Sequence, residues 1–222
     1  MSFVVSLLSD SLEQLPEKQI YRYMGMSEIP QSGEVRELVE KLKPKFLDKV
    51  QCKACYMIVH VRMTESFVDL SVLSVNSVHL ARNLAGCEHA ILFAATLGMA
   101  CEQQRRRAAA VSPAEGLVLD AMGSAAIEQF CDQICCSFAK AYPNDRLRPR
   151  FSPGYGDFTL ETQEKLLHVL DARRKIGISM SDGYLMIPQK SVTAVVGLSK
   201  MGCKKAVPDC ESCDHADCEF RL

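Results

Sequence analysis

The sequence RLRPRFSPGYGDF, residues 146–158, separates two long apolar patterns and decides how the elements on either side are ordered. Pro153-Gly154 favours a tight turn, and the glycines on either side of Tyr155 leave the main chain open to a closely approaching ligand. Arg150 offers a planar guanidinium to a carboxylate or phosphate, and Tyr155 offers a ring that can stack or face a cation. The same residues would also suit a plain connection between helices, so both interpretations stay open.

Helices are predicted on both sides of this loop. Upstream, Ser112-Pro113-Ala114-Glu115 combines a capping box with proline at the first helical position, which predicts a long helix ending at Tyr142-Pro143. Downstream, a helix is expected over 160–175, with Gly177 as its stop. A hairpin of 178–180 with 184–187 follows it, and then one more strand over 192–198.

The N-terminal half adds further elements. Apolar residues at helical spacing predict a helix over 34–42, which Pro44 ends or bends. Residues 55–61 and 68–75 are rich in β-branched side chains and predict two paired antiparallel strands. A short helix over 76–84 and a buried strand over 90–97 follow. The pattern predicts an α+β fold in which long helices pack on a twisted antiparallel sheet.

Length and charge exclude several classes of protein. The 222 residues, 48% of them hydrophobic, suffice to bury roughly 70% of the unfolded surface around one core. With 26 basic and 27 acidic side chains and no run of five like charges, a nucleic-acid partner is not expected. No apolar run approaches the ~20 residues that span a bilayer, and the N-terminus lacks a signal-peptide pattern. We therefore expect a soluble, cytoplasmic protein without a membrane partner.

The segment Arg150-Phe151-Ser152-Pro153-Gly154-Tyr155 resembles the R-x-x-P-G-Y segment of the activation domain of cobalamin-dependent methionine synthase, which binds S-adenosylmethionine. In that family a helix follows, and then an S-F-x-M-x-P turn leads into a strand that begins S-V. Here the helix 160–175 is followed by Gly183-Tyr184-Leu185-Met186-Ile187-Pro188 and then by Ser191-Val192. The resemblance covers about 150–196 and implies a stand-alone reactivation domain with the fold of that family.

The resemblance also implies a role for each matching residue. Arg150 would pair with the carboxylate of S-adenosylmethionine, and the main chain at Ser152 and Gly154 would hold the nucleoside. Tyr155 would lie against the adenosyl and sulfonium end and act as the catalytic residue that aligns the methyl group. Glu128 would lie near the ligand's amino group, with a solvated helix carboxylate as its alternative role.

The sequence departs from the family in three places near the expected ligand. Past its S-V strand the family has a further tyrosine near the nucleotide, whereas this chain continues into a cysteine-rich segment. Gly156-Asp157-Phe158 replaces the family's P-A-C-P, so a different loop wall is expected. The family's N-terminal aspartate, which contacts the ligand's amine, has no clear counterpart near residues 21–26. These departures affect the expected affinity for the ligand more than its identity.

The implied reaction is reductive methylation of cob(II)alamin on a separate methionine synthase or other corrinoid protein. The chain would then be an enzyme of the methyltransferase type, with cobalamin carried by that partner and a flavodoxin- or ferredoxin-like protein as electron donor. Displacement at a sulfonium needs no proton transfer, so orientation and exclusion of water are the tasks left to the protein. Two alternatives are a non-catalytic S-adenosylmethionine-sensing or docking module, and an iron–sulfur reductant of corrinoid proteins.

The eleven cysteines fall into two groups. We expect residues 1–200 to form the activation-like domain and 201–222 to form a cysteine-rich tail with Cys203, Cys210, Cys213 and Cys218. Four thiolates at this density suit zinc or an iron–sulfur cluster, and free or disulfide-paired thiols are the alternative. Core packing is the better account of Cys52-x2-Cys55, because residues three apart in a strand point to opposite faces. The same account is preferred for the helical cysteines Cys131, Cys135 and Cys136.

Overall fold

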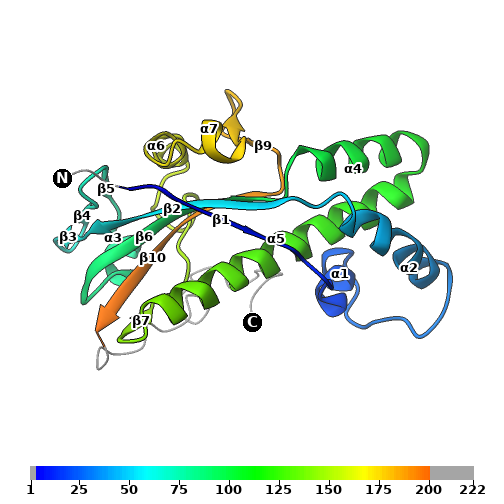
Figure 1. The fold of residues 1–222 in the computed structure, drawn as a ribbon, viewed down its shortest axis with the longest axis horizontal. Coiled ribbons are helices and arrows are strands. Elements are labelled where there is room, and N and C mark those ends of the chain that lie inside the picture. The colour runs from blue at the N-terminus through cyan, green and yellow to red at the C-terminus, as the bar shows by residue number, and fades with distance from the viewer. Residues whose placement is uncertain (1–3, 201–222) are drawn as a thin grey trace.

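A five-stranded antiparallel sheet forms the centre of the computed structural model, which describes residues 4–200 (Figure 1). In spatial order its strands are β1 Ser6–Asp10, β2 Cys52–His60, β6 Cys87–Thr96, β10 Ser191–Lys200 and β7 Asp145–Leu147. Every neighbouring pair in this sheet is antiparallel. The predicted α+β class is therefore confirmed.

The central strands are buried on both faces. In β6, Ile91 and Phe93 belong to one apolar core, whereas Leu92 and Ala94 belong to the other. This alternation follows from the two-residue period of a strand, and it explains why 90–97 is almost continuously apolar. Each face of the sheet must therefore be covered by its own layer.

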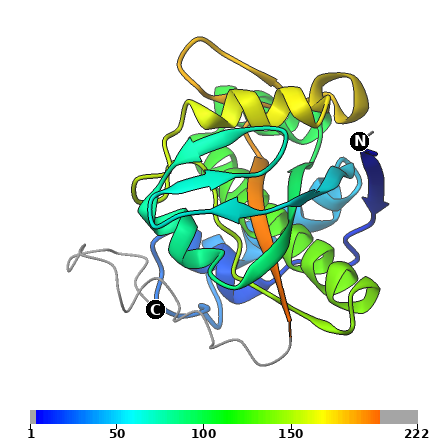
Figure 2. The ribbon, with the colours of Figure 1, turned by 90° about the vertical axis from the view of Figure 1, so that its left-hand side faces the viewer.

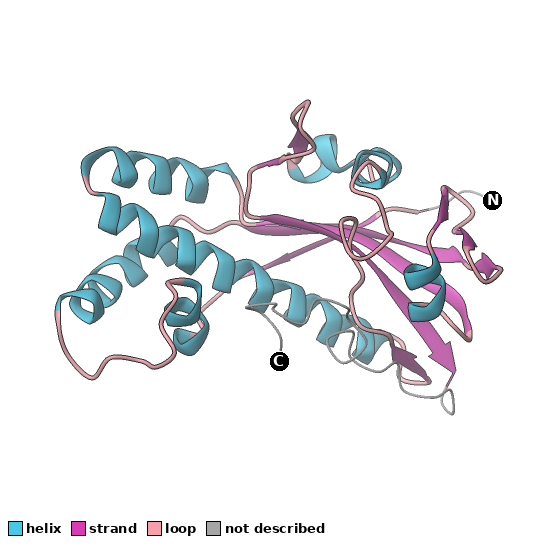
Figure 3. Cartoon of the chain, turned by 180° about the vertical axis from the view of Figure 1, so that it is seen from behind, coloured by secondary structure: helices cyan, strands magenta, loops and turns pink. Residues whose placement is uncertain are grey.

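The long helix α5 covers one face of the sheet and the other helices of this layer lie around it (Figure 3). The layer consists of α1 Glu17–Tyr23, α2 Glu34–Leu47, α4 Met99–Val111 and α5 Pro113–Ala141. As predicted, the Ser112 side chain caps α5, accepting a hydrogen bond from the Glu115 N–H at 3.3 Å. The apolar stripe of α5, represented by Phe130 and Ile134, lies in the core beneath the sheet.

Shorter elements cover the opposite face, and a small three-stranded sheet closes one end of this layer (Figure 2). The helices are α3 Val78–Asn83, α6 Thr162–Val169 and α7 Ala172–Ile176. The small sheet contains β3 Arg62–Met63, β4 Phe67–Asp69 and β5 Ser74–Asn76, and β8 Ser179–Met180 pairs with β9 Met186–Ile187. The predicted hairpin around residues 181–183 is confirmed by this last pair.

Two helix predictions need correction. Of the two outcomes expected at Pro44, an end of the helix is excluded, because α2 continues to Leu47 and places Phe46, which is fully buried, in the core. The helix expected over 160–175 is two helices, since Asp171 adopts a left-handed conformation with φ of 50°. Aspartate tolerates that conformation better than most residues, and the break buries both Leu170 and Ala172.

The strand expected over 68–75 is also wrong. A turn divides it into β4 and β5, because Ser71 has φ of 66° and its N–H donates to Asp69 Oδ1 at 2.9 Å. The turn buries Leu70 and Leu73 together, an arrangement that β-branched content alone does not reveal. β2 consequently pairs with β1 and β6 rather than with 68–75.

The cysteines of the described chain differ in their surroundings. Cys52 and Cys55 lie in the two opposite cores, as predicted for a strand, and burial raises the pKa of each thiol to about 12. Cys131 is buried as expected. The core prediction is wrong for Cys136, which is exposed, and only partly right for Cys135, which is half-buried.

The cysteine-rich tail, with Cys203, Cys210, Cys213 and Cys218, lies outside the described residues. Between residues 4 and 200, no group of three or more His, Cys, Asp or Glu side chains is placed to hold a metal ion. Over the same residues, no helix combines the length and apolar character required to cross a membrane.

Candidate functional site

A cavity of about 870 Å³ opens between α5, the 146–155 segment and the start of β10. Its wall combines charged groups from α5 and the loop with polar and apolar groups from α6, β9 and β10. The lining residues are Glu128, Cys135, Arg146, Leu147, Arg148, Pro149, Arg150, Ser152, Pro153, Tyr155, Gln163, Met186, Ser191, Val192 and Thr193. The cavity thus brings together four residues predicted from the sequence, Glu128, Arg150, Ser152 and Tyr155.

Arg150 is held by two carboxylates of α5. Its Nη1 donates to Asp132 Oδ1 at 2.5 Å, and its Nη2 donates to Glu128 Oε2 at 2.8 Å. Glu128 and Asp132 are four residues apart, so they lie on one face of the helix, one turn from each other. Burial lowers the pKa of Arg150, but the hydrogen bond with Asp132 and the electrostatic influence of Cys131, Cys135 and Asp132 together outweigh burial, so the pKa lies above its ordinary value.

The loop main chain is held to the sheet before it turns. Phe151 forms a two-way backbone bridge with Val195 of β10, with N···O distances of 3.0 and 2.9 Å. The turn then closes through the Gly154 N–H, which donates to the Phe158 carbonyl at 2.7 Å. Gly154 has φ of 97° and is not among the lining residues. Its expected main-chain contact with a nucleoside therefore stays a prediction, as does that of Ser152.

Asp157 fixes the far side of the turn to α3. Its carboxylate accepts hydrogen bonds from Ser77 Oγ at 2.5 Å, from Val78 N at 2.7 Å and from His79 N at 3.2 Å. Gly156 packs so closely on His79 that a Cβ at this position would lie 2.3 Å from the imidazole Nδ1. The residues that depart from the family pattern thus form the anchor of the loop.

Glu128 acts electrostatically on two tyrosines, Tyr23 and Tyr155. Tyr155 is 55% exposed and packs edge-on against Phe151, with ring centroids 5.8 Å apart. Tyr23 is the last residue of α1, a helix that packs against α5. Burial, and then the negative charge of Glu128, raise the pKa of both phenols. A carboxylate beside two aromatic rings is an environment suited to a cation.

The opposite end of the cavity is uncharged and polar. The buried Gln163 amide donates to the Tyr184 carbonyl at 3.0 Å, and its Oε1 accepts from Thr193 Oγ1 at 3.4 Å. Ser191 Oγ donates to the Pro188 carbonyl at 2.7 Å. The cavity therefore has an ionic end at α5 and an amide and hydroxyl end at β10, which would suit a ligand with one charged and one heterocyclic part.

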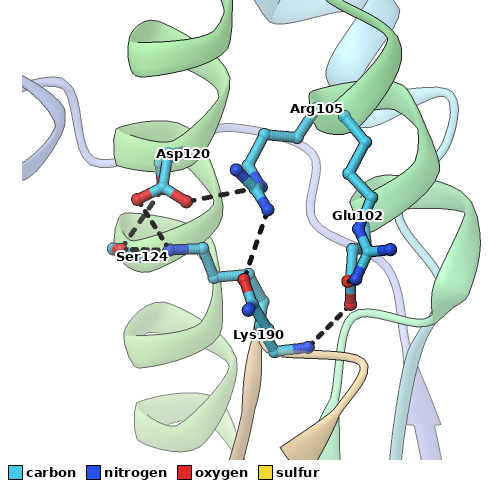
Figure 4. Close-up of polar contacts among 7 residues, drawn as sticks. Glu102, Arg105, Asp120, Ser124 and Lys190 are labelled. Carbon is cyan, nitrogen blue, oxygen red and sulfur yellow. Dashed lines mark hydrogen bonds and ion pairs between the residues drawn. The ribbon is translucent and has the colours of Figure 1, made fainter. Parts of the chain in front are cut away.

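A polar network holds the turn that leads into β10 (Figure 4). Lys190 Nζ lies 3.0 Å from Asp120 Oδ2 and donates to Ser124 Oγ at 2.8 Å, so the turn is tied to α5. The buried Glu102 of α4 accepts a hydrogen bond from the Gln189 N–H at 2.8 Å. Because Ser191, Val192 and Thr193 follow directly, this network positions one wall of the cavity.

Several lining residues were not identified from the sequence. Arg146 and Arg148 belong to the quoted segment but were not assigned a role; β7 and the bridge at Phe151 bring both to the cavity. Gln163 and Thr193 carry no recognisable motif, and Met186, although it belongs to the segment that resembles S-F-x-M-x-P, was not assigned a role. Asp132 could have been found from its helical spacing to Glu128 once Arg150 was considered as their partner.

No protein-family model matches the chain, and no curated protein sequence matches it. Among solved structures, a crystal structure of the MetH reactivation domain bound to AdoHcy has the same fold, with a TM-score of 0.67. The match covers 91% of this chain and 81% of that chain, at 12% sequence identity. The fold expected from the resemblance is confirmed.

Proposed function

We propose that this chain binds S-adenosylmethionine in the cavity between α5 and β10 and serves as a reactivation module for a corrinoid protein. One observation carries the proposal. In a fold shared with a domain crystallised with AdoHcy, Glu128, Arg150, Ser152 and Tyr155 line a single cavity. Its ionic end offers a guanidinium and a carboxylate to an amino acid, and its polar end offers Gln163 and Thr193 to a nucleoside.

The reaction needs one electron and one methyl group. An electron from a low-potential, flavodoxin- or ferredoxin-like donor reduces cob(II)alamin on the partner to cob(I)alamin. The cobalt then attacks the methyl carbon as the carbon–sulfur bond breaks, which gives methylcobalamin and S-adenosylhomocysteine. In this scheme the ionic end of the cavity holds the amino acid part of the ligand. Tyr155 bounds the position of the sulfonium and helps to exclude water.

Ligand binding is the first experiment. Titration calorimetry with AdoHcy and S-adenosylmethionine is expected to show binding. Arg150→Ala should weaken it about 10- to 100-fold, because a hydrogen bond to a charged group typically contributes ~1.5–3 kcal/mol. A wild-type protein that binds neither ligand at millimolar concentration would remove the main support for the proposal.

Turnover is the second experiment. With the cognate corrinoid protein and a low-potential donor, the chain should accelerate methylcobalamin formation, with little change in rate between pH 6 and 8. High S-adenosylmethionine should partly rescue Arg150→Ala, whereas Tyr155→Ala should stay slow at saturation because the methyl group is misaligned. Binding without acceleration would favour the sensing or docking alternative.

The tail enters the proposal as a metal site. Cys203, Cys210, Cys213 and Cys218 would hold one zinc ion or one iron–sulfur cluster, and a cluster could relay the electron. Elemental analysis and the visible spectrum of protein made anaerobically test this, with Cys210→Ser/Cys213→Ser as the variant that should lose the metal. Metal-free wild-type protein with four titratable tail thiols would exclude both versions.

A further inference from the structure

The groups proposed to bind the amino acid part of the ligand are already bonded to each other. Arg150 Nη2 and Glu128 Oε2 form an ion pair at 2.8 Å, and both residues line the cavity. A ligand whose carboxylate takes Nη2 of Arg150 and whose ammonium takes Oε2 of Glu128 must therefore open this pair. The inference below rests on the proposed function and concerns how the same site selects its ligand.

We propose that the site binds by exchange of ion pairs and is therefore selective for zwitterionic adenosyl amino acids. The ligand's carboxylate replaces Glu128 on Nη2 of Arg150, and the ligand's ammonium replaces Arg150 on Glu128. Asp132 stays bonded to Nη1 throughout and is the positioning residue that keeps the guanidinium in place.

The geometry separates the two carboxylates by function. Glu128 is a lining residue of the cavity, whereas Asp132 is not. Nη1 of Arg150 bonds to Asp132 at 2.5 Å and lies 3.9 Å from Cys135 Sγ, and the Asp132 side chain is 63% exposed. Nη2 bonds only to Glu128 among the described residues. A ligand that enters the cavity thus meets the Glu128 side of Arg150 first.

Asp132 and Glu128 also differ in how they act on Arg150. Burial lowers the pKa of Arg150, and the hydrogen bond with Asp132 is the largest of the influences that raise it. The Asp132 contact is the shorter one as well, at 2.5 Å against 2.8 Å. Because Glu128 lines the cavity and Asp132 does not, the pair with Glu128 is the one that a ligand opens.

Exchange explains why both ligand charges are needed together. A zwitterion replaces the opened pair with two pairs of the same kind, so no charge is left alone in the site. A ligand with only a carboxylate would leave Glu128 without the counter-charge that Arg150 supplies at 2.8 Å. A ligand with only an amine would leave Nη2 of Arg150 without its carboxylate.

Four ligands test the proposal on the full chain by calorimetry. They are AdoHcy, its deaminated analogue 4-(5′-adenosylthio)butyrate, its decarboxylated analogue and 5′-methylthioadenosine, which lacks the amino acid part. For the wild type, the two singly charged analogues should bind no better than 5′-methylthioadenosine. In Glu128→Gln no pair has to open, so the deaminated analogue should bind about three- to tenfold more tightly than to the wild type, while AdoHcy binds more weakly.

Asp132→Asn tests the positioning role. It should weaken the binding of AdoHcy and of the deaminated analogue about fivefold. The affinity for the decarboxylated analogue should not change, because only ligands with a carboxylate pair with Arg150. A general loss of structure would weaken all four ligands and lower the thermal midpoint. Glu164→Gln, an exposed glutamate of α6 outside the cavity, is the matched control and should change none of the affinities.

The outcomes distinguish this inference from the proposed function. If AdoHcy binds but Glu128→Gln does not tighten the deaminated analogue, the charges act independently, and exchange is excluded while the function stands. If singly charged analogues bind the wild type nearly as well as AdoHcy, exchange is likewise excluded. If AdoHcy itself does not bind, both the function and the exchange are overturned.

Discussion

Asp157 and Ser77 join the 146–158 loop to α3, with the carboxylate Oδ1 2.5 Å from the hydroxyl. The Ser77 hydroxyl also accepts a hydrogen bond from Leu80 N at 3.0 Å, so it caps the helix while it donates to the loop. The two residues are 80 positions apart in the sequence. One hydrogen-bonded unit therefore sets the position of both the turn and the first residues of α3.

Asp157→Asn should destabilise the protein, by about 1 kcal/mol if the loss is like that of a typical helix cap. Burial raises the pKa of Asp157, but the hydrogen bonds from Ser77, Val78 and His79 outweigh it and lower the pKa below its usual value. A lowered folded-state pKa means that the stabilisation is present above the unfolded-state pKa, near 3.9, and is lost as the pH falls through the folded-state value. Thermal midpoints should thus differ most above pH 5 and converge in more acidic buffer.

A gap between wild type and variant that is as large at pH 3 as at pH 7 would contradict this account. Asp182→Asn, a substitution in the 181–183 turn, serves as the control and should show little effect at either pH.

Gly156→Ala should destabilise the turn for two reasons. The backbone has φ of 54°, and the added Cβ would lie 2.3 Å from His79 Nδ1. Gly177→Ala is the matched control, because Gly177 has φ of 77° but no atom within 4 Å of the Cβ position. The control isolates the backbone penalty, about 1–2 kcal/mol. The decrease in the free energy of unfolding caused by Gly156→Ala, measured by urea denaturation, should be larger than this penalty.

Removing the imidazole should restore part of the difference. In the double variant Gly156→Ala/His79→Ala the steric conflict is gone. The free energy of unfolding that this variant loses relative to His79→Ala should therefore approach the free energy that Gly177→Ala loses relative to the wild type. Equal losses for the two glycine substitutions in the wild-type background would show that His79 does not constrain the turn.

The long helix α5 was predictable because its signals are local. Ser112-Pro113-Ala114-Glu115 marks the beginning, and an apolar stripe fixes the buried face. The same holds for the hairpin of β8 and β9. The pairing of the strands was harder to predict, because β2 pairs with β1 and β6, which are far from it in the sequence. The turn at Ser71 depends on Asp69 and on packing, which β-branched composition does not report.

For the site, the quoted loop and its resemblance pointed to Arg150 and Tyr155, and the fold places both at one cavity. The second carboxylate, Asp132, was missed because a single acidic residue on a helix carries no motif until its partner is known. Tyr23 could not be predicted for another reason. It comes from α1, and its place beside Glu128 follows from tertiary packing of α1 on α5.

Glu102→Gln should destabilise the protein and loosen the cavity wall. Glu102 is buried, accepts from the Gln189 N–H at 2.8 Å and pairs with Arg106. Hydrogen bonds to charged groups contribute about 1.5–3 kcal/mol, so the free energy of unfolding, measured by urea denaturation, should fall by an amount in this range. Affinity for AdoHcy should fall several-fold, because Ser191, Val192 and Thr193 follow the held turn.

Glu115→Gln is the control for this substitution. Glu115 pairs with Lys41 at 2.9 Å on the surface, where an ion pair contributes at most about 1 kcal/mol. Equal losses for Glu102→Gln and Glu115→Gln, with no change in AdoHcy affinity, would show that the network does not support the cavity.

Cysteine reactivity should follow burial rather than sequence spacing. Burial raises the pKa of Cys52, Cys55 and Cys101 to about 12, so almost no thiolate exists at pH 8 and the folded protein shields these groups. Cys136 is exposed one residue after the half-buried Cys135 and should be the first cysteine of 4–200 to react. Alkylation with iodoacetamide for a few minutes, followed by peptide mass spectrometry, measures this order. Labelling in urea is the control, and there all of these cysteines should react. Modification of Cys52 or Cys55 before Cys136 in the folded protein would contradict the burial assigned to β2.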